Sequence, residues 1–305
     1  MKEPLILDIK GNSLDDGPGI RSVVFFKGCP LSCLWCHNPE SKRRELEISY
    51  DPKDCVHCDT CMEICTEKAL SPDNPFFIDR KKCTLCMQCV EACPSGALSR
   101  VGSVMEIDAI VRDVARDKPF FKTSGGGVTL SGGEPTLSMD FLSRLVRAFR
   151  EQEIHVLVET CGMFRLEDFL DKVYPHINAI YMDIKIMDKA AHQQYCGTSN
   201  EVILKNFKAL NQLYQEGGVE ILPRTPLIPG ITDSDENIGA VISFLQECGV
   251  KKADVLPYHP LWQEKNFKIG IKDSRGDAPA MQSFLDKDRL QACREAFLAA
   301  GIQLA

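Results

Sequence analysis

Three features are missing from this sequence of 305 residues. No apolar run approaches the roughly 20 residues that a membrane-spanning helix needs, so we expect no transmembrane segment. The first residues, MKEPLILDIKGNSLDD, carry neither the apolar core nor the small-residue cleavage site of a signal peptide. The net charge is −7 and no basic stripe or tail is present, which argues against nucleic acid as a partner. We therefore expect a cytoplasmic protein that binds neither membranes nor nucleic acid.

Cysteine, in contrast, is abundant, with 15 residues in the chain. In a small secreted protein this content would indicate a disulfide framework, but this chain is long and lacks a signal peptide. Eleven of the cysteines fall between Cys29 and Cys93 in spacings typical of metal sites. Iron–sulfur clusters in a reducing cytoplasm explain that pattern better, and because exposed clusters are oxygen-labile we expect an anaerobic setting. The other four have no motif spacing and are interpreted as buried or incidental thiols: Cys161, Cys196, Cys248 and Cys293.

The first cysteine group lies on one short loop, FFKGCPLSCLWCHNPES, in the spacing Cys-x3-Cys-x2-Cys. Three thiolates on such a loop can ligate three irons of a [4Fe–4S] cube and leave the fourth iron open to an outside molecule. The alternatives are a disulfide cluster or a zinc site, but zinc prefers four tetrahedral ligands, usually from two separated Cys-x2-Cys pairs. The spacing therefore predicts a reactive cluster held by Cys29, Cys33 and Cys36.

Residues 55 to 93 carry a second cysteine field made of two similar halves, CVHCDTCMEIC and CTLCMQCVEACP. Each half reads Cys-x2-Cys-x2-Cys-x3-Cys and the halves are offset by 28 residues, so we interpret them as an internal repeat. The field resembles a bacterial two-cluster ferredoxin, in which the fourth cysteine of each run ligates the other cluster. Thr66 stands where that pattern has proline, and zinc is again the alternative. The resemblance implies one [4Fe–4S] cluster on Cys55, Cys58, Cys61 and Cys93, and another on Cys65, Cys83, Cys86 and Cys89.

Outside this field, short β-branched apolar runs alternate with amphipathic stretches, as in parallel sheets whose strands are joined by helices. Six such units predict a partial (β/α)6 barrel over residues 1–45 and 101–305. The ferredoxin-like insert is expected at 46–100, with cluster motifs at about 46–75 and 74–103. The expected strands are Ser22–Phe26, Gly127–Leu130, His155–Glu159, Ala179–Ile184, Val219–Pro223 and Ala253–Leu256. The expected helices include Val104–Arg116, Met139–Glu151, Leu204–Gln215, Asp235–Glu247 and Lys287–Ala300.

A polar motif follows each expected strand, and in parallel α/β folds the carboxyl ends of the strands form the active site. In SGGEP (131–135), two glycines let backbone carbonyls approach a ligand and Glu134 supplies negative charge for an ammonium group, although alone the motif would indicate an ordinary turn. Asp183 and Lys185 in MDIK alternate and so share a face, with a surface ion pair as the alternative. For His259 in PYHP, the alternative is a structural histidine. The remaining motifs are the cysteine loop, Glu159–Thr160 with Gly162, and Arg224–Thr225.

The cysteine loop resembles the signature of the radical S-adenosylmethionine (radical SAM) enzymes. Trp35, just before the third cysteine, fits that family's Cys-x3-Cys-x-aromatic-Cys form, and SGGEP is similar to its Gly-Gly-Glu motif. The resemblance implies that the open iron chelates SAM and that the reduced cluster cleaves it to methionine and a 5′-deoxyadenosyl radical. It also implies the fold class: α/β, a partial (β/α)6 radical SAM barrel with an inserted two-cluster bacterial ferredoxin-like domain.

Segments along nearly the whole chain resemble the activating enzymes of glycyl-radical enzymes, such as the pyruvate formate-lyase activase. They are DDGPGIRSVVFFKGC, CHNPE, SGGEP, the E-T-C-G segment, MDIK and VLPYH. The insert, which the formate-lyase activase lacks, is similar to the subclass that serves glycyl-radical lyases, dehydratases, decarboxylases and hydrocarbon-adding enzymes. The resemblance implies an oxidoreductase that removes a hydrogen atom from a glycine of a partner enzyme. Isethionate sulfite-lyase and choline lyase are examples of such partners, and the choice among them stays open.

The resemblance further implies three [4Fe–4S] clusters, flavodoxin or ferredoxin as reductant, and a monomer. In the formate-lyase activase a monovalent cation lies at the segments equivalent to E-T and MDIK. Glu159 replaces an aspartate here, so the cation is left open. The segment Asp16–Arg21 is expected near the incoming glycine loop. The residues implied to contact SAM are Trp35, His37, Asn38, Gly132, Gly133, Glu134, Asp183, Lys185 and His259.

Two alternatives to the activase interpretation remain open at this point. One is a radical SAM enzyme that acts on a small molecule or a peptide, because the cysteine loop alone does not specify a substrate. The other is an electron-transfer or assembly protein built around the ferredoxin-like insert. The second alternative leaves the polar motifs at the six strand ends without a role.

Overall fold

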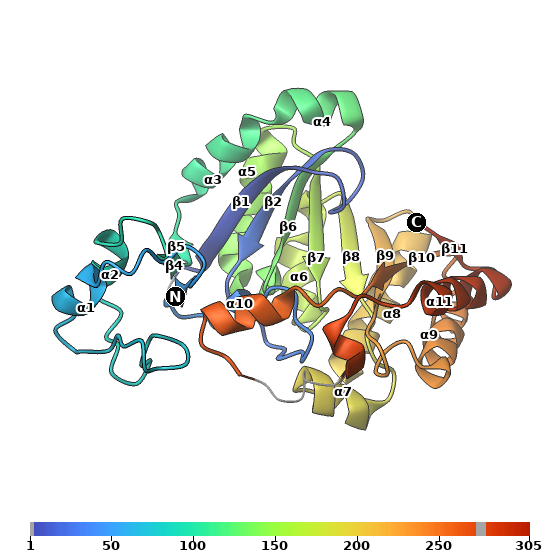
Figure 1. Cartoon of the computed structure of the whole chain (residues 1–305). Helices are drawn as coiled ribbons and strands as arrows, with labels where there is room; N and C mark the ends of the chain where they lie inside the picture. Colours follow the sequence, from blue (N-terminus) through green and yellow to red (C-terminus); the bar gives the residue numbers. More distant parts are fainter. Residues whose placement is uncertain (1–2, 273–278) are drawn as a thin grey trace.

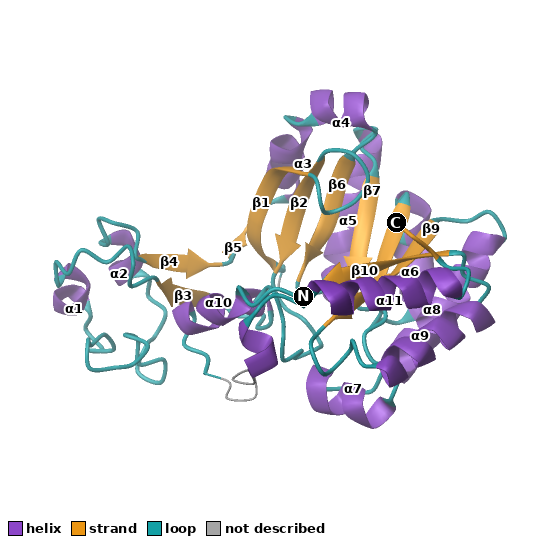
Figure 2. Ribbon diagram, turned by 45° about the vertical axis from the view of Figure 1, so that its right-hand side comes forward, coloured by secondary structure: helices purple, strands orange, loops and turns teal. Residues whose placement is uncertain are grey.

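A mostly parallel sheet organises the larger part of the computed structural model, which describes residues 3–272 and 279–305. β1 (Leu5–Ser13) and β5 (Ser103–Val104) extend one edge in antiparallel pairing, and β11 (Gln303–Leu304) extends the other edge in parallel. Within the described residues the first and last parallel strands do not pair with each other, so the sheet stays open (Figures 1 and 2). The predicted partial barrel is confirmed by six parallel strands in chain order: β2 (Arg21–Phe26), β6 (Gly127–Gly132), β7 (Val156–Thr160), β8 (Ala179–Asp183), β9 (Glu220–Leu227) and β10 (Lys252–Pro257).

Helices connect the parallel strands and cover one side of the sheet (Figure 2). In α5, the predicted Met139–Glu151, five apolar residues from Phe141 to Phe149 are buried at the spacing of one helix face. Ser234 caps α9, the predicted Asp235–Glu247, by accepting a hydrogen bond from the backbone of Asn237. None of the helices that the structure describes is long and apolar enough to cross a membrane. The others are α3 (Ile107–Ala115), α4 (Lys118–Ser124), α6 (Leu166–Lys172), α7 (Lys189–Cys196), α8 (Glu201–Gln215), α10 (Trp262–Lys268) and α11 (Lys287–Ala299), with 3-10 turns η1 (Pro39–Ser41), η2 (Pro135–Ser138), η3 (Tyr174–His176) and η5 (Pro279–Gln282).

One strand is longer than its sequence pattern predicts. The apolar run predicted that this strand ends at Pro223. Instead β9 continues to Leu227, and every residue from Ile221 onward is buried. Arg224 and Thr225 therefore lie inside the strand, where Arg224 is paired with Asp183 of β8 and Asp254 of β10, and the prediction that they follow its end is wrong.

The segment that contains the second cysteine field stands beside the sheet with a small apolar core of its own (Figure 1). Two antiparallel strands, β3 (Glu47–Tyr50) and β4 (Leu98–Val101), join its two ends. Between them lie two short helices, α1 (Thr60–Ile64) and α2 (Gln88–Glu91). The core is formed by Ile48, Tyr50, Leu70, Phe77, Ile78, Met87, Cys89, Ala97 and Leu98.

The internal repeat predicted from the cysteine spacing is visible in the backbone. His57 and Leu85 occupy equivalent positions, and both have positive φ angles, 54° and 58°. The next equivalent pair, Asp59 and Met87, also has positive φ, 58° and 66°, and each residue directly precedes its short helix. Residues other than glycine rarely adopt this left-handed backbone conformation. Its recurrence at both pairs shows that the two halves turn their cysteine loops in the same way.

Candidate functional site

The cysteine loop leaves the carboxyl end of β2 and is held by backbone hydrogen bonds on both sides. The amide of Cys29 donates to the carbonyl of Lys42 at 3.1 Å, which closes the loop on itself. The amides of Ser32 and Leu34 donate to the carbonyls of Cys196 and Tyr195, at 2.9 and 3.0 Å. The loop is therefore fixed against the carboxyl end of α7 as well as against the sheet.

Three lysines donate to backbone carbonyls of this loop and the turn that follows it. The ammonium of Lys27 lies 2.6 Å from the carbonyl of Glu40. Lys42 lies 2.7 Å from the carbonyl of Cys33, and Lys265 lies 3.0 Å from that of His37. An irregular loop leaves carbonyls without backbone partners, and these ammonium groups satisfy three of them. They also bring positive charge to a place where three thiolates are expected.

Two cysteines without motif spacing lie against the loop. Cys196 neighbours Cys33, and hydrogen bonding by its thiol is the main reason that the pKa of Cys33 falls to about 7. Cys161 neighbours Cys29, and Cys29 together with burial raises the pKa of the Cys161 thiol well above its usual value. Burial instead raises the pKa of Cys36 to about 12, although Lys42 opposes the change. Both extra cysteines are buried, as expected, but their contact with the cluster loop was not visible in the sequence.

The Gly-Gly-Glu turn packs directly against the start of the cysteine loop. A Cβ atom on Gly133 would lie 2.3 Å from the carbonyl oxygen of Gly28, so only glycine fits there. The carboxylate of Glu134 is buried and accepts four hydrogen bonds, two from Thr136, one from the Thr160 hydroxyl and one from the Cys161 amide. These bonds use its lone pairs. Glu134 therefore fixes the turn to the end of β7, and its contact with an ammonium group stays a prediction.

Four charged side chains form a buried network across β7, β8 and β9. The ammonium of Lys185 lies 2.8 Å from Asp183, and the guanidinium of Arg224 lies 3.1 Å from the same carboxylate. Arg224 also contacts Glu159 at 2.5 Å, and the other oxygen of Glu159 accepts from the Ser131 hydroxyl at 2.5 Å. Burial acts to raise the pKa of Asp183, but Lys185 and Arg224 outweigh it and hold that pKa below its usual value. Arg224 was noted in the sequence only as a polar residue at a strand end.

His37 and His259 stack face to face beside the cluster loop. Their ring centres are 3.8 Å apart, and burial lowers the pKa of His37 to about 4, with His259 and Lys265 adding to the shift. His37 Nε2 and His259 Nδ1 are both buried without a hydrogen-bond partner in the described part of the chain. Buried polar atoms without partners are rare in folded proteins and indicate a missing ligand or water.

The other residues implied to contact SAM lie around this stack with different exposure. Asn38 follows His37 and accepts a hydrogen bond from Lys265 at 3.1 Å. Burial acts to lower the pKa of the Lys185 ammonium, but Asp183 and then the nearby thiols of Cys33 and Cys161 outweigh it and raise that pKa. Trp35 is only 4% exposed and packs in the barrel core, so its contact with SAM stays a prediction.

The segment Asp16–Arg21 lies at the opposite end of β2 from the cysteine loop. Arg21 is fully buried, donates to the Thr129 hydroxyl at 2.6 Å, and also contacts the carbonyl of Val128. Thr129 in turn donates to the carbonyl of Asp16 at 2.7 Å. This segment closes the amino-terminal end of the sheet, and its contact with an incoming glycine loop stays a prediction.

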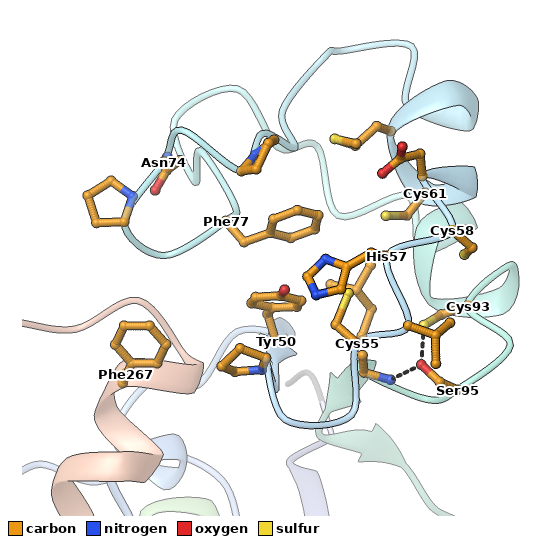
Figure 3. Close-up of a pocket in the computed structure, with 18 residues that line it drawn as sticks. Tyr50, Cys55, His57, Cys58, Cys61, Asn74, Phe77, Cys93, Ser95 and Phe267 are labelled. Carbon is orange, nitrogen blue, oxygen red and sulfur yellow. Dashed lines mark hydrogen bonds between the residues drawn. The ribbon is translucent and has the colours of Figure 1, made fainter.

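The eight cysteines of the insert gather around two separate cavities. A cavity of about 280 Å³ is lined by Cys55, Cys58 and Cys61 of the first run and by Cys93 of the second (Figure 3). Tyr50 and Phe77 stack at its wall with ring centres 4.2 Å apart. Each cavity takes three cysteines from one run and one from the other, as in the ferredoxin pattern. The second cavity, of about 20 Å³, is lined by the other set: Cys65, Cys83, Cys86 and Cys89.

The cysteines around the cavities stand apart from one another. No three His, Cys, Asp or Glu side chains within residues 3–272 and 279–305 converge closely enough to hold a single metal ion. Cys58 and Cys86 are exposed, while Cys89 is buried. The burial of Cys89 raises the pKa of its thiol to about 11, and the neighbouring thiols Cys83, Cys65 and Cys86 add to the shift. Those three neighbours are the other members of its predicted ligand set.

Comparisons with protein families identify both parts of the chain. The Radical SAM superfamily matches residues 80–241, and the 4Fe-4S dicluster domain matches residues 47–94. The first match begins beyond the loop of Cys29, Cys33 and Cys36, so the assignment of that loop depends on its own motif. The second match covers all but the ends of the insert.

Two curated relatives are similar to the chain over most of its length. It is 41% identical over 270 residues to the trans-4-hydroxy-L-proline dehydratase activating enzyme of Clostridioides difficile, covering 87% of this chain and 88% of that protein. It is 42% identical over 267 residues to the isethionate sulfite-lyase activating enzyme of Nitratidesulfovibrio vulgaris, covering 86% of each. A solved radical SAM methyltransferase from Sphaerobacter thermophilus matches 100% of this chain and 77% of its own, with a TM-score of 0.55 and 14% identity, which shows the shared fold alone.

Proposed function

Because the chain belongs to the radical SAM enzymes that activate glycyl-radical enzymes, we propose that its cysteine loop and the neighbouring strand ends form the SAM-cleaving site. When bound there, a reduced [4Fe–4S] cluster supplies one electron to the SAM sulfonium, which gives methionine and the 5′-deoxyadenosyl radical that takes a hydrogen atom from a glycine of the partner. Glycine suits this reaction because it has no Cβ atom, so its backbone can enter a narrow site.

Cys29, Cys33 and Cys36 would hold that cluster. Their loop is held by backbone bonds to α7 and by three lysines, so packing of the protein fixes the backbone that carries the thiols. The thiols of Cys196 and Cys161 neighbour Cys33 and Cys29, and would donate hydrogen bonds to these two ligand sulfurs. Hydrogen bonds to ligand sulfurs tune the potential of iron–sulfur clusters, so these two cysteines belong to the second layer of the site.

The unpartnered buried nitrogens of His37 and His259 carry the proposal for SAM. They lie beside the cysteine loop, where an adenosylmethionine molecule would supply the missing hydrogen-bond partners. The Asp183–Lys185 pair would meet its ribose hydroxyls and carboxylate, because each bears the complementary charge or lone pairs. Gly132 and Gly133 would let the backbone approach the amino group, while Glu134 orients that turn.

The residues that the resemblance connects with a monovalent cation do not fit one. Both oxygens of Glu159 accept from Arg224 and Ser131, and both oxygens of Asp183 contact Lys185 or Arg224. The Thr160 hydroxyl donates to Glu134. A bound cation would have to displace a guanidinium that already supplies the positive charge. We therefore propose that Arg224 supplies the positive charge at this position and that the reaction needs no bound cation.

Two further [4Fe–4S] clusters would occupy the cavities of the insert. Three cysteines from one run and one from the other line each cavity, and this supports the ligand sets Cys55, Cys58, Cys61 with Cys93, and Cys65, Cys83, Cys86 with Cys89. The separate core of the insert supports its division from the barrel at residues 46–100. A flavodoxin or ferredoxin would deliver the electrons, and the insert would relay them to the barrel.

The partner is a glycyl-radical enzyme, and we propose a lyase or dehydratase, as the names of the relatives indicate. The test combines the anaerobically reconstituted enzyme, SAM, dithionite and the candidate partner. We expect a glycyl doublet in the electron paramagnetic resonance (EPR) spectrum of the partner and an equivalent amount of 5′-deoxyadenosine. Deoxyadenosine formation on a small substrate, without a glycyl doublet for any such partner, would sink the activase assignment.

A further inference from the structure

Helix α10 lies between the cysteine loop and the insert (Figures 1 and 2). It begins three residues after His259, and its first residue is anchored in the barrel. The indole of Trp262 donates to the Tyr258 hydroxyl at 2.7 Å, and that hydroxyl donates to the carbonyl of Met281 at 2.8 Å. Trp262 and Tyr258 are almost fully buried. This end of the helix therefore cannot shift without disturbing the PYHP segment that carries His259.

One face of α10 contacts the insert through residues 264, 267 and 268, which are neighbours on a helix surface. The ammonium of Lys268 lies 2.6 Å from Asp51, and Glu264 lies 2.8 Å from Lys53. The ring of Phe267 packs at a tilt against that of Phe76, with ring centres 5.6 Å apart, and Phe267 also lines the larger cysteine cavity (Figure 3). Among the residues that line the two cavities, Phe267 is the one contributed by the barrel. The larger cavity is thus the one connected with α10.

Lys265 points the other way, toward the segment that follows Cys36. Its ammonium donates to the carbonyl of His37 at 3.0 Å and to Asn38 Oδ1 at 3.1 Å. It also forms an ion pair with Glu40 at 3.1 Å. An ammonium has three donors, and all three are directed at residues 37–40. Both residues of the histidine stack are therefore connected with α10, His37 through the bond of its backbone carbonyl to Lys265 and His259 through the chain.

We propose that Lys265 is a positioning residue that fixes His37 and Asn38, and that α10 thereby couples the histidine stack to the larger cysteine cavity of the insert. The inference rests on the proposed function, because it is the SAM site that these residues would shape. Lys265 itself touches neither the cysteines nor the reacting atoms in the contacts described above. It keeps the ring nitrogens of His37 and His259 and the side-chain amide of Asn38 in one arrangement. A ligand then does not lose affinity by ordering these groups when it binds.

The first test compares Lys265→Met and Lys265→Arg with Lys205→Met, a control on an exposed residue of α8. The reconstituted enzyme is assayed without a partner for reductive SAM cleavage under dithionite. Loss of the ammonium is expected to raise the KM for SAM about five- to tenfold and to change kcat less than about twofold. The reason is that the substitution frees the positions of His37 and Asn38 but removes no reacting group. The SAM concentration that gives half of the EPR change of the reduced cluster should rise equally. Lys265→Arg should restore most of both values.

The second test measures coupling by hydrogen exchange in the same reconstituted enzyme. The amides of Ser41 and Lys42, which donate to the carbonyls of Asn38 and Pro39, report on the order of η1. Lys265→Met and, more weakly, Lys268→Met should speed their exchange, although Lys268 contacts only the insert, Glu264 and the end of the helix. If Lys265→Met does not fold, the exchange rates in Lys268→Met still test the coupling.

The outcomes separate this inference from the proposed function. Unchanged exchange at Ser41 and Lys42 in Lys268→Met would overturn the coupling. A SAM KM in Lys265→Met equal to that of the wild type would overturn the positioning role. A wild-type enzyme whose reduced cluster shows no EPR change with SAM would instead overturn the proposed SAM site. If Lys205→Met raises the KM as much as Lys265→Met, the effect is general and the positioning role also fails.

Discussion

The cysteine loop of the barrel and the cysteine runs of the insert prepare their sites in different ways. The barrel loop is held by α7, by the sheet and by three lysines from three parts of the chain. The insert has a core of nine buried residues, two exposed cysteines, and backbone turns with positive φ. A segment of this size buries little apolar surface, so its own core is only marginally stabilising. The contrast indicates that packing shapes the loop of the barrel, and we expect the insert to depend more on metal ligation for its shape.

The sharpest test of this contrast removes one cysteine from each region. Cys33→Ala is expected to reduce SAM cleavage under dithionite to the background rate, because it removes a ligand of the reacting cluster. Cys86→Ala should lower the iron content from about 12 to about 8 atoms per chain and retain dithionite-driven cleavage, since this small reductant can reach the barrel directly. Cys248→Ala is the matched control, with full iron and full activity. Loss of dithionite-driven cleavage in Cys86→Ala would break the contrast.

Removal of iron should separate the two regions by their backbone order. After anaerobic chelation, amides of the insert between residues 55 and 93 are expected to exchange about a hundredfold faster or more, because metal binding and folding are coupled there. Amides of β6 and β7 should keep their protection, since all of the residues of β7 and most of those of β6 are buried in the sheet. Hydrogen exchange followed by mass spectrometry gives both rates in one experiment. An insert that stays protected without iron would contradict the assignment of its stability to the metal.

Much of this arrangement could be predicted because it is local in sequence. The resemblance to a two-cluster ferredoxin implied the two sets of cysteines that line the cavities of the insert, and the alternation of apolar runs predicted six strands and the bounds of α5 and α9. The contacts of Cys196, Cys161 and Lys265 could not be predicted, since each joins the cysteine loop to an element more than a hundred residues away. Side-chain partners at that separation depend on the packing of the whole sheet.

Glu134 and Arg224 show a second limit of the sequence patterns. The Gly-Gly-Glu motif was expected to offer the negative charge of Glu134 to an ammonium group, but in the fold this carboxylate accepts four hydrogen bonds from protein donors. Because the strand was expected to end at Pro223, the position of Arg224 inside β9 was not predicted. Only the register between β8 and β9, which pairs Asp183 with Arg224, reveals the buried ion pair.

Arg224 provides a test of how much its buried ion pairs stabilise the barrel. Arg224→Met would leave Glu159 buried without its cation, which is expected to destabilise the barrel by about 3–5 kcal/mol in urea unfolding. Because Asp183 keeps Lys185, the larger part of the loss should come from Glu159. In the wild type, replacing potassium and sodium by a bulky organic cation should leave SAM cleavage unchanged. A strict requirement for either metal ion would refute the assignment of that charge to Arg224.

The smallest expected effect concerns the histidine stack and pH. His37 has a folded-state pKa of about 4, because burial and then His259 and Lys265 disfavour its charged form. An unfolded histidine has a pKa near 6.5, so between pH 8 and pH 6 the unfolded chain binds protons that the folded chain does not. Stability should therefore fall as pH falls through this window, and the loss should continue down to the folded pKa.

For His37 alone this linkage amounts to about 0.8 kcal/mol between pH 8 and pH 6. Urea unfolding of the reconstituted enzyme at both pH values should show a difference that is smaller by this amount in His37→Gln than in the wild type, with equal m values. Because the two proteins differ only at residue 37, the other titratable groups cancel and the difference reports on the burial of His37. Equal pH dependence in the two proteins would mean that His37 is accessible to water, and the claim that packing fixes the loop before ligands bind would lose its support at that residue.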